Sequence, residues 1–220
     1  MQPAAIGGWP MADGYELTAQ GEKERAMAIE QARSTGQGAT FERYVEAMRA
    51  AWAAGQDETL PARAQVLLER LLREAPADEP WAVELVRDQA RARALYRDPD
   101  YGFVQMGHIM HPGPGPGTTP HDHGPCWVLY GVYRGAIEIT TFRRTDDGST
   151  PGKAALEEIE TVRLTPGVVR PYLRGDIHLQ RPVDPNGSIV LRFLSFDLEQ
   201  VDRLGYDLAT GTITPIPAVR

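Results

Sequence analysis

Positions 121 to 135 read HDHGPCWVLYGVYRG and join a pair of histidines to a strand-like run. Side chains alternate between the two faces of a sheet along a strand, so residues two apart share a face. One face of this run would carry Trp127, Leu129, Gly131 and Tyr133, and the other Cys126, Val128, Tyr130 and Val132. We expect one of these two faces to line the interior of a barrel.

The rest of the second half also has the texture of a β protein. After Arg97-Asp98-Pro99-Asp100, short β-rich runs are separated by Gly and Pro, which predicts an antiparallel sandwich or barrel. The expected strands are 102 to 110, 126 to 133, 136 to 143, 156 to 164, 168 to 173 and 188 to 197. The run HPGPGPGTTP at 111 to 120 would form a stiff loop, because its prolines cannot donate to a ladder.

The first half is predicted to be helical. Its helices are expected at Thr40 to Ala54, at Thr59 to Ala75 and at Asp78 to Tyr96, with a weaker one at 17 to 33. Asp78 before Pro80 has the pattern of a helix start. We therefore expect a helical region over 1–97 packed on a mainly β barrel over 98–220.

Composition limits the class of protein. With 220 residues and 42% hydrophobic content, the chain can build the core of one ordinary domain with an appendage. A net charge of -7 argues against a nucleic-acid partner. No apolar run approaches the roughly 18 residues of a membrane span, the first 30 positions lack a leader pattern, and Cys126 is the single cysteine. We expect a soluble, cytoplasmic chain without a membrane partner.

Two histidines at positions i and i+2 are candidates for one metal site. On an extended segment, His121 and His123 would lie on the same face, and His178 is a third candidate ligand. An HxH pair alone is weak evidence, because histidines that only form hydrogen bonds in a core or at a surface are more common.

The wider spacing resembles the two-part pattern of the cupin superfamily. The residues that carry this pattern are Gly115, His121, His123, Gly135, Gly167, Gly175 and His178. The resemblance implies a double-stranded β-helix barrel with a metal in its mouth. Most cupins also have a glutamate four or five residues after the second histidine, where this chain has Trp127 and Val128. Three neutral imidazoles would leave the full charge on a divalent ion, which favours an anionic ligand such as a thiolate or enolate.

Within the cupins, the chain resembles the thiol dioxygenases, the family of cysteine dioxygenase and mercaptopropionate dioxygenase. Landmarks of that family occur in its order over residues 90 to 200: LYRDPD at 95 to 100, PGPGT at 114 to 118, HDH at 121 to 123, GVYRGA at 131 to 136 and GDIH at 175 to 178. The resemblance implies Fe(II) held by His121, His123 and His178, and oxidation of a small thiol by O2 to its sulfinic acid. No organic cofactor is expected.

Arginines are the candidates for holding the substrate. Arg93 stands where cysteine dioxygenases have an arginine that binds the substrate carboxylate, although QARARAL also fits a solvated helix face. Arg170, Arg174 and Arg192 are the competing anchors for a carboxylate or phosphate.

The chain departs from the family in its late strand. A Ser, His and Tyr relay is expected there, but Val190, Arg192 and Leu194 occupy the corresponding places. Tyr130, Tyr172 or Tyr133 could supply the missing phenol. The other polar candidates receive structural roles: Cys126 as a packing residue, His108 and His111 as hydrogen-bonding residues, and Asp122 as an outer hydrogen-bond partner of the site.

Two other classes of function stay open. A three-histidine cupin could be a lyase, an isomerase or a zinc hydrolase, since zinc-bound hydroxide suits the same ligands. It could also be a ligand-sensing barrel with a vestigial metal site. The sequence does not fix the oligomeric state or the identity of the thiol.

Overall fold

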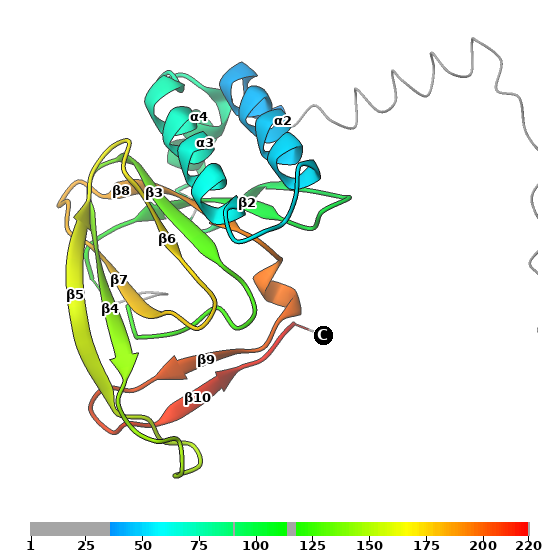
Figure 1. Ribbon diagram of the computed structural model, residues 1–220. Coiled ribbons are helices and arrows are strands. Elements are labelled where there is room, and N and C mark those ends of the chain that lie inside the picture. Colours follow the sequence, from blue (N-terminus) through cyan, green and yellow to red (C-terminus); the bar gives the residue numbers. More distant parts are fainter. Residues whose placement is uncertain (1–35, 90, 114–117, 220) are drawn as a thin grey trace, which may run out of the picture. The chain divides into compact units, whose positions relative to one another are not determined.

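The computed structural model describes residues 36–89, 91–113 and 118–219, all of which belong to one compact unit of the chain. In this part, helices precede two antiparallel sheets and a final hairpin (Figure 1). The helices are α2 (Ala39–Ala53), α3 (Leu60–Glu74), α4 (Pro80–Asp88) and the short 3-10 turn η1 (Leu198–Gln200). None of these is long and apolar enough to cross a membrane.

The strands form a five-stranded sheet, a three-stranded sheet and a hairpin. The larger sheet has the order β1-β2-β8-β3-β6, with β1 at Arg93–Arg97, β2 at Val104–Met110, β8 at Ser188–Leu194, β3 at Val128–Arg134 and β6 at Val169–Tyr172. The smaller sheet has the order β5-β4-β7, with β5 at Leu156–Leu164, β4 at Ile137–Arg144 and β7 at Ile177–Pro182. The hairpin pairs β9 (Arg203–Tyr206) with β10 (Ile213–Ile216).

The two faces of β3 separate two cores. Val128, Tyr130 and Val132 point into the barrel, where they join a cluster that includes Val190 of β8 and Ile139 of β4. The alternate residues, such as Leu129, belong to a different cluster that the three helices share. The alternation predicted for this strand is therefore observed, and its Tyr130 face is the one that lines the interior.

The helix layer contacts β3 closely because Gly131 has no side chain. A Cβ atom at this position would lie 2.5 Å from Leu72 Cδ1 and 2.9 Å from Val169 Cγ2. In the same cluster as Leu72, the indole of Trp52 on α2 stacks on that of Trp127 with ring centroids 5.6 Å apart. Aromatic and aliphatic packing thus fixes the helices to the outer face of the larger sheet.

The segment that carries the first two histidines links the smaller sheet to the final hairpin. His121 and His178 exchange two backbone hydrogen bonds of 3.0 Å. On its other side, the segment pairs with β9: the Asp122 N–H donates to the Leu204 carbonyl at 3.0 Å, and the Tyr206 N–H donates to the Pro120 carbonyl at 2.8 Å. Residues 120–122 are therefore held between β7 and β9.

The fold class is confirmed: the chain is mainly β, with a cupin-like barrel and an N-terminal helical region. The six expected strands correspond to β2, β3, β4, β5, β6 and β8. The weaker helix at 17 to 33 and positions 114 to 117 of the proline loop lie outside the described residues.

One helix was predicted too long. The expected helix to Tyr96 ends at Asp88, Gln89 follows with a left-handed φ of 47°, and Arg93–Arg97 forms strand β1 against β2. The Ala- and Arg-rich composition favours a helix locally, but pairing with β2 prevails over this propensity. The first barrel strand thus lies inside the stretch that was assigned to the helical region.

Candidate metal centre

Three imidazoles meet inside the barrel. His121 and His123 come from the extended segment, and His178 comes from β7, which pairs with that segment. One nitrogen from each ring lies within 4.8 Å of the others, and all three residues are buried. Small side-chain rotations bring such nitrogens to about 2.0–2.1 Å from one ion. The structure therefore places together the three histidines that the sequence singles out.

The hydrogen bonds of these rings leave nitrogens for a cation. Nδ1 of His121 lies 2.9 Å from the Thr119 carbonyl oxygen, so this nitrogen carries the proton and Nε2 is the unprotonated one. Neither nitrogen of His178, nor Nδ1 of His123, has a hydrogen-bond partner among the described residues, although these atoms are buried. Unpartnered buried nitrogens are costly without a ligand, so the site fits a metal ion.

The electrostatic surroundings favour neutral imidazoles. Burial, and then the neighbouring histidines, lowers the pKa of His123 and of His178 well below the usual value. Burial lowers the pKa of His121 as well, against a smaller opposite effect of its bond to Thr119. All three side chains are therefore in the metal-binding form at neutral pH. No Asp or Glu among the described residues belongs to this group.

Two of the three candidate tyrosines stand beside the histidines. The hydroxyl of Tyr130 lies 3.4 Å from Nε2 of His123. The ring centroids of Tyr172 and His178 are 4.2 Å apart. The Tyr172 hydroxyl is buried near Thr141 without a hydrogen bond of ordinary geometry, and burial raises its pKa. Tyr133 is on the other face of β3, where its hydroxyl donates to the Pro76 carbonyl at 2.9 Å.

Of the predicted arginines, Arg192 lies on the barrel's inner face. Its place in β8 is opposite Tyr130 of β3 and Met106 of β2. Its Nε atom is buried and has no hydrogen-bond partner, and its charge contributes to the lowered pKa of His178. A positively charged group of this kind beside a metal site can bind an anionic part of a substrate.

The proposed role of Arg93 is corrected by the structure. Arg93 lies opposite Gly107 on the helix side of β1, where its guanidinium pairs with Glu84 at 2.7 Å and Asp88 at 3.2 Å. The bulge after Ala94 and the acidic side chains of α4 keep it on the outer face of the sheet. It therefore does not face the histidines.

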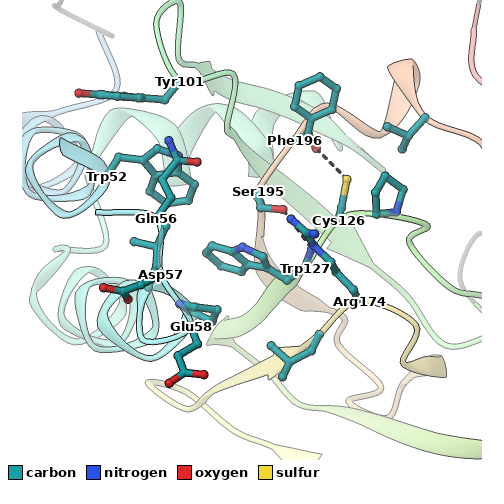
Figure 2. Close-up of a pocket in the computed structure, with 15 residues that line it drawn as sticks. Trp52, Gln56, Asp57, Glu58, Tyr101, Cys126, Trp127, Arg174, Ser195 and Phe196 are labelled. Carbon is teal, nitrogen blue, oxygen red and sulfur yellow. Dashed lines mark hydrogen bonds between the residues drawn. The ribbon is translucent and has the colours of Figure 1, made fainter. Parts of the chain in front are cut away.

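The other two arginine candidates also lie elsewhere. Arg170 is on β6 and forms an ion pair with Glu160 of β5. Arg174 is exposed and lines a surface pocket of about 860 Å³ together with Trp52, Trp127, Ser195 and Phe196 (Figure 2). No histidine lines this pocket. Substrate contact by Arg174 at the histidine site therefore has no support in the geometry.

Sequence reasoning missed Arg203. It lies on β9, two residues before Gly205, which forms a bridge with His121. Its Nε atom is buried without a hydrogen-bond partner, and its charge contributes to the lowered pKa of His121 and His123. No local signal pointed to it, because β9 was not predicted and the histidine segment that is hydrogen-bonded to β9 lies more than 80 positions earlier in the chain.

The remaining polar candidates have structural partners. Asp122 accepts hydrogen bonds from the Gly124 N–H at 3.0 Å, the Leu204 N–H at 3.1 Å and the Tyr206 hydroxyl at 3.0 Å, and none of these partners is a ring of the three histidines. Nδ1 of His108 lies 3.0 Å from the Arg91 carbonyl oxygen. Cys126 is buried between the surface pocket and the barrel core, and burial raises the pKa of its thiol.

The sequence matches no protein-family model and no curated protein. Solved structures similar to it include KdgF from Halomonas sp., at 17% identity over 50% of this chain and 83% of that chain, with a TM-score of 0.36. Oxalate oxidase in complex with the substrate analogue glycolate is 18% identical over 43% of this chain and 42% of that chain, with a TM-score of 0.34. The Cnp3 cupin domain of Schizosaccharomyces pombe is 14% identical over 48% and 60%, with a TM-score of 0.34.

Proposed function

We propose that the protein is an Fe(II)-dependent dioxygenase that converts a small thiol to its sulfinic acid, RSH + O2 giving RSO2H. The observation that carries this proposal is the group of three buried imidazoles, which no Asp or Glu of the described residues joins. His121, His123 and His178 would hold the ion. With three neutral ligands, Fe(II) would keep its full positive charge, which favours a thiolate as the incoming ligand, and it would supply the redox chemistry that dioxygen requires.

The chain's own residues would position the reactants. The hydrogen bond from Nδ1 of His121 to Thr119 fixes that ring's orientation and tautomer. The apolar side chains of the inner cluster, such as Val128 and Val190, exclude water from the site. The Tyr130 hydroxyl stands where it can donate a hydrogen bond or a proton next to His123. Tyr130 thereby takes the place of the tyrosine that the late strand lacks.

A metal analysis followed by oxygen uptake tests the proposal. We expect about one iron per chain after anaerobic reconstitution with Fe(II). Addition of cysteine, 3-mercaptopropionate or cysteamine should then cause thiol-dependent oxygen uptake, with the sulfinate detected by mass spectrometry. The variant His178→Ala should lose iron and activity, whereas His111→Ala, which changes an exposed histidine, should retain both.

The contrary outcome also has a clear form. If none of these thiols supports oxygen uptake by the iron-loaded protein, the dioxygenase assignment is wrong. Tight binding of zinc with no redox activity would instead favour a lyase, isomerase or hydrolase with the same three ligands.

A further inference from the structure

The surface pocket that Arg174 lines is formed where several loops of the fold meet (Figure 2). Its lining residues come from the turn between α2 and α3, from the loops between β1 and β2 and between β6 and β7, and from the segments before β3 and after β8. Its volume of about 860 Å³ lies in the range of roughly 300–1,000 Å³ that is usual for small-molecule sites. The pocket is therefore large enough for a small ligand and, like many binding sites, is built on loops.

The base of this pocket is aromatic. The indoles of Trp52 and Trp127 line it, stack on each other with ring centroids 5.6 Å apart, and are buried in the cluster that the helices share. Two large apolar side chains of its lining stay open to solvent, since Leu173 is 50% exposed and Phe196 is 42% exposed. A flat apolar molecule would cover this exposed area, and the gain in free energy grows with the apolar area removed from water.

Two charged residues of the pocket lie on opposite sides of Trp127. Figure 2 shows Glu58, in the turn before α3, on one side of the indole and Arg174, in the loop before β7, on the other. Neither charged side chain has a hydrogen bond or an ion pair with another residue of the part that the structure describes. Burial raises the pKa of the Cys126 thiol, and the charge of Arg174 has a smaller, opposite effect, so the guanidinium lies near the pocket's wall.

The other acidic residue of the lining is engaged within its own turn. Asp57 accepts hydrogen bonds from the Thr59 N–H at 2.9 Å and the Thr59 hydroxyl at 2.6 Å, and it lies 3.6 Å from the guanidinium of Arg63. Among the described lining residues, one carboxylate and one guanidinium thus remain unpaired, at Glu58 and Arg174. A ligand with opposite charges at its two ends complements this arrangement.

We propose that this pocket binds a small zwitterion whose ammonium and carboxylate groups are separated by a flat apolar body. Its carboxylate would meet Arg174, since a guanidinium can hold a carboxylate through two parallel hydrogen bonds. Its ammonium would donate to Glu58, and its apolar body would lie against Trp127. The site does not depend on the proposed function, because none of its lining residues is a candidate metal ligand.

Calorimetric titration of the full-length protein with EDTA present tests the proposal. The chelator removes metal ions, so a carboxylate held by a metal at the histidines does not contribute. The probes are two zwitterions of different length, 4-(aminomethyl)benzoate and phenylalanyl-phenylalanine, and two analogues with one charge, 4-methylbenzoate and 4-methylbenzylamine. We expect at least one zwitterion to bind at one site per chain, and more tightly than either analogue.

Variants that remove one charge should separate the two ends of the ligand. Arg174→Gln should weaken binding of the zwitterion and of 4-methylbenzoate about threefold or more and leave 4-methylbenzylamine unaffected. Glu58→Gln should weaken the zwitterion and 4-methylbenzylamine and leave 4-methylbenzoate unaffected. The matched controls Arg143→Gln and Glu157→Gln, which break an exposed ion pair on the smaller sheet, should bind every probe like the parent protein. All four side chains are exposed, so thermal unfolding should show that each variant folds.

Three outcomes would overturn the proposal. In the first, neither zwitterion binds, or neither binds more tightly than the analogues with one charge. In the second, Arg143→Gln weakens carboxylate binding as much as Arg174→Gln, which would show an effect of net charge alone. In the third, Arg192→Gln abolishes carboxylate binding and Arg174→Gln does not, which would place the anion inside the barrel.

Discussion

The hydroxyl of Tyr130 is the polar group of β3 that reaches the candidate metal centre. It lies 3.4 Å from Nε2 of His123, within a buried cluster. If this hydroxyl assists proton movement at the site, Tyr130→Phe should lower kcat for thiol oxidation by about 10²-fold or more while leaving iron content unchanged. Steady-state oxygen uptake and iron analysis measure the two quantities.

A tyrosine on the opposite face of the same strand provides the control. The Tyr133 hydroxyl donates to the carbonyl groups of Ala75 and Pro76 and faces the helices. Tyr133→Phe should reduce stability by about 1 kcal/mol and leave kcat unchanged. Equal kcat values for Tyr130→Phe and the parent protein would remove the catalytic role of Tyr130.

His108 should make stability depend on pH. Burial lowers its pKa from the ordinary value of 6.5 to about 3, so between these values the unfolded chain binds the proton and the folded chain does not. The free energy of unfolding therefore falls as pH falls through this window, by up to about 1.4 kcal/mol per pH unit from this side chain. Urea unfolding of the metal-free protein at pH 7, 5.5 and 4.5 measures the slope. In His108→Gln the slope should be smaller by one proton's contribution, and an unchanged slope would contradict the assignment.

At the scale of residues, the sequence identified the three candidate metal ligands but only part of their surroundings. His121, His123 and His178 stood out because their spacing matches a known pattern. The direction of an arginine is decided by the strand face on which it lies. Arg93 has the place in the chain that the family resemblance requires, but it lies on the outer face of the sheet, where it pairs with Glu84. No sequence motif or spacing singled out Arg203.

At the scale of elements, the contact between α3 and β3 depends on the missing side chain of Gly131. An added methyl group would overlap Leu72 Cδ1, at 2.5 Å, and Val169 Cγ2, at 2.9 Å. Gly131→Ala should therefore lower the free energy of unfolding by about 1–3 kcal/mol, as overpacking commonly does. Chemical denaturation measures the change. Gly205→Ala is the matched control, because its nearest atom would be 3.5 Å away, and a loss as large in this variant would show that the close approach is not the cause.

The strands that were predicted and those that were missed differ in a physical way. Runs such as 156–164 have enough local β propensity and flanking turns to be recognised, and they match β5 in the structure. Strands β9 and β10 have four residues each, so their periodic signal is short. The chain at 93–97 has helix-favouring composition and becomes a strand through its contact with β2. Such pairing depends on residues that are distant in sequence and does not appear in a local pattern.

At the scale of the whole molecule, the metal should stabilise the folded chain. The three histidines come together only through tertiary pairing, so the unfolded chain offers no comparable site. At a free metal concentration 100 times the Kd, the free energy of unfolding should rise by about 2.7 kcal/mol. Thermal unfolding with and without a chelator measures this, and His178→Ala should show no such shift. The same shift in His178→Ala would place the metal elsewhere.

The position of the final hairpin also determines when the site can form during synthesis. Asp122, between the first two histidines, is bonded to Tyr206, 84 positions later in the chain. A nascent polypeptide that has emerged only through the strand of His178 still lacks β9, and so lacks the edge that holds this segment in place. Contacts of such long sequence separation form slowly. Metal capture should therefore be a late event, after the ribosome has released the hairpin residues.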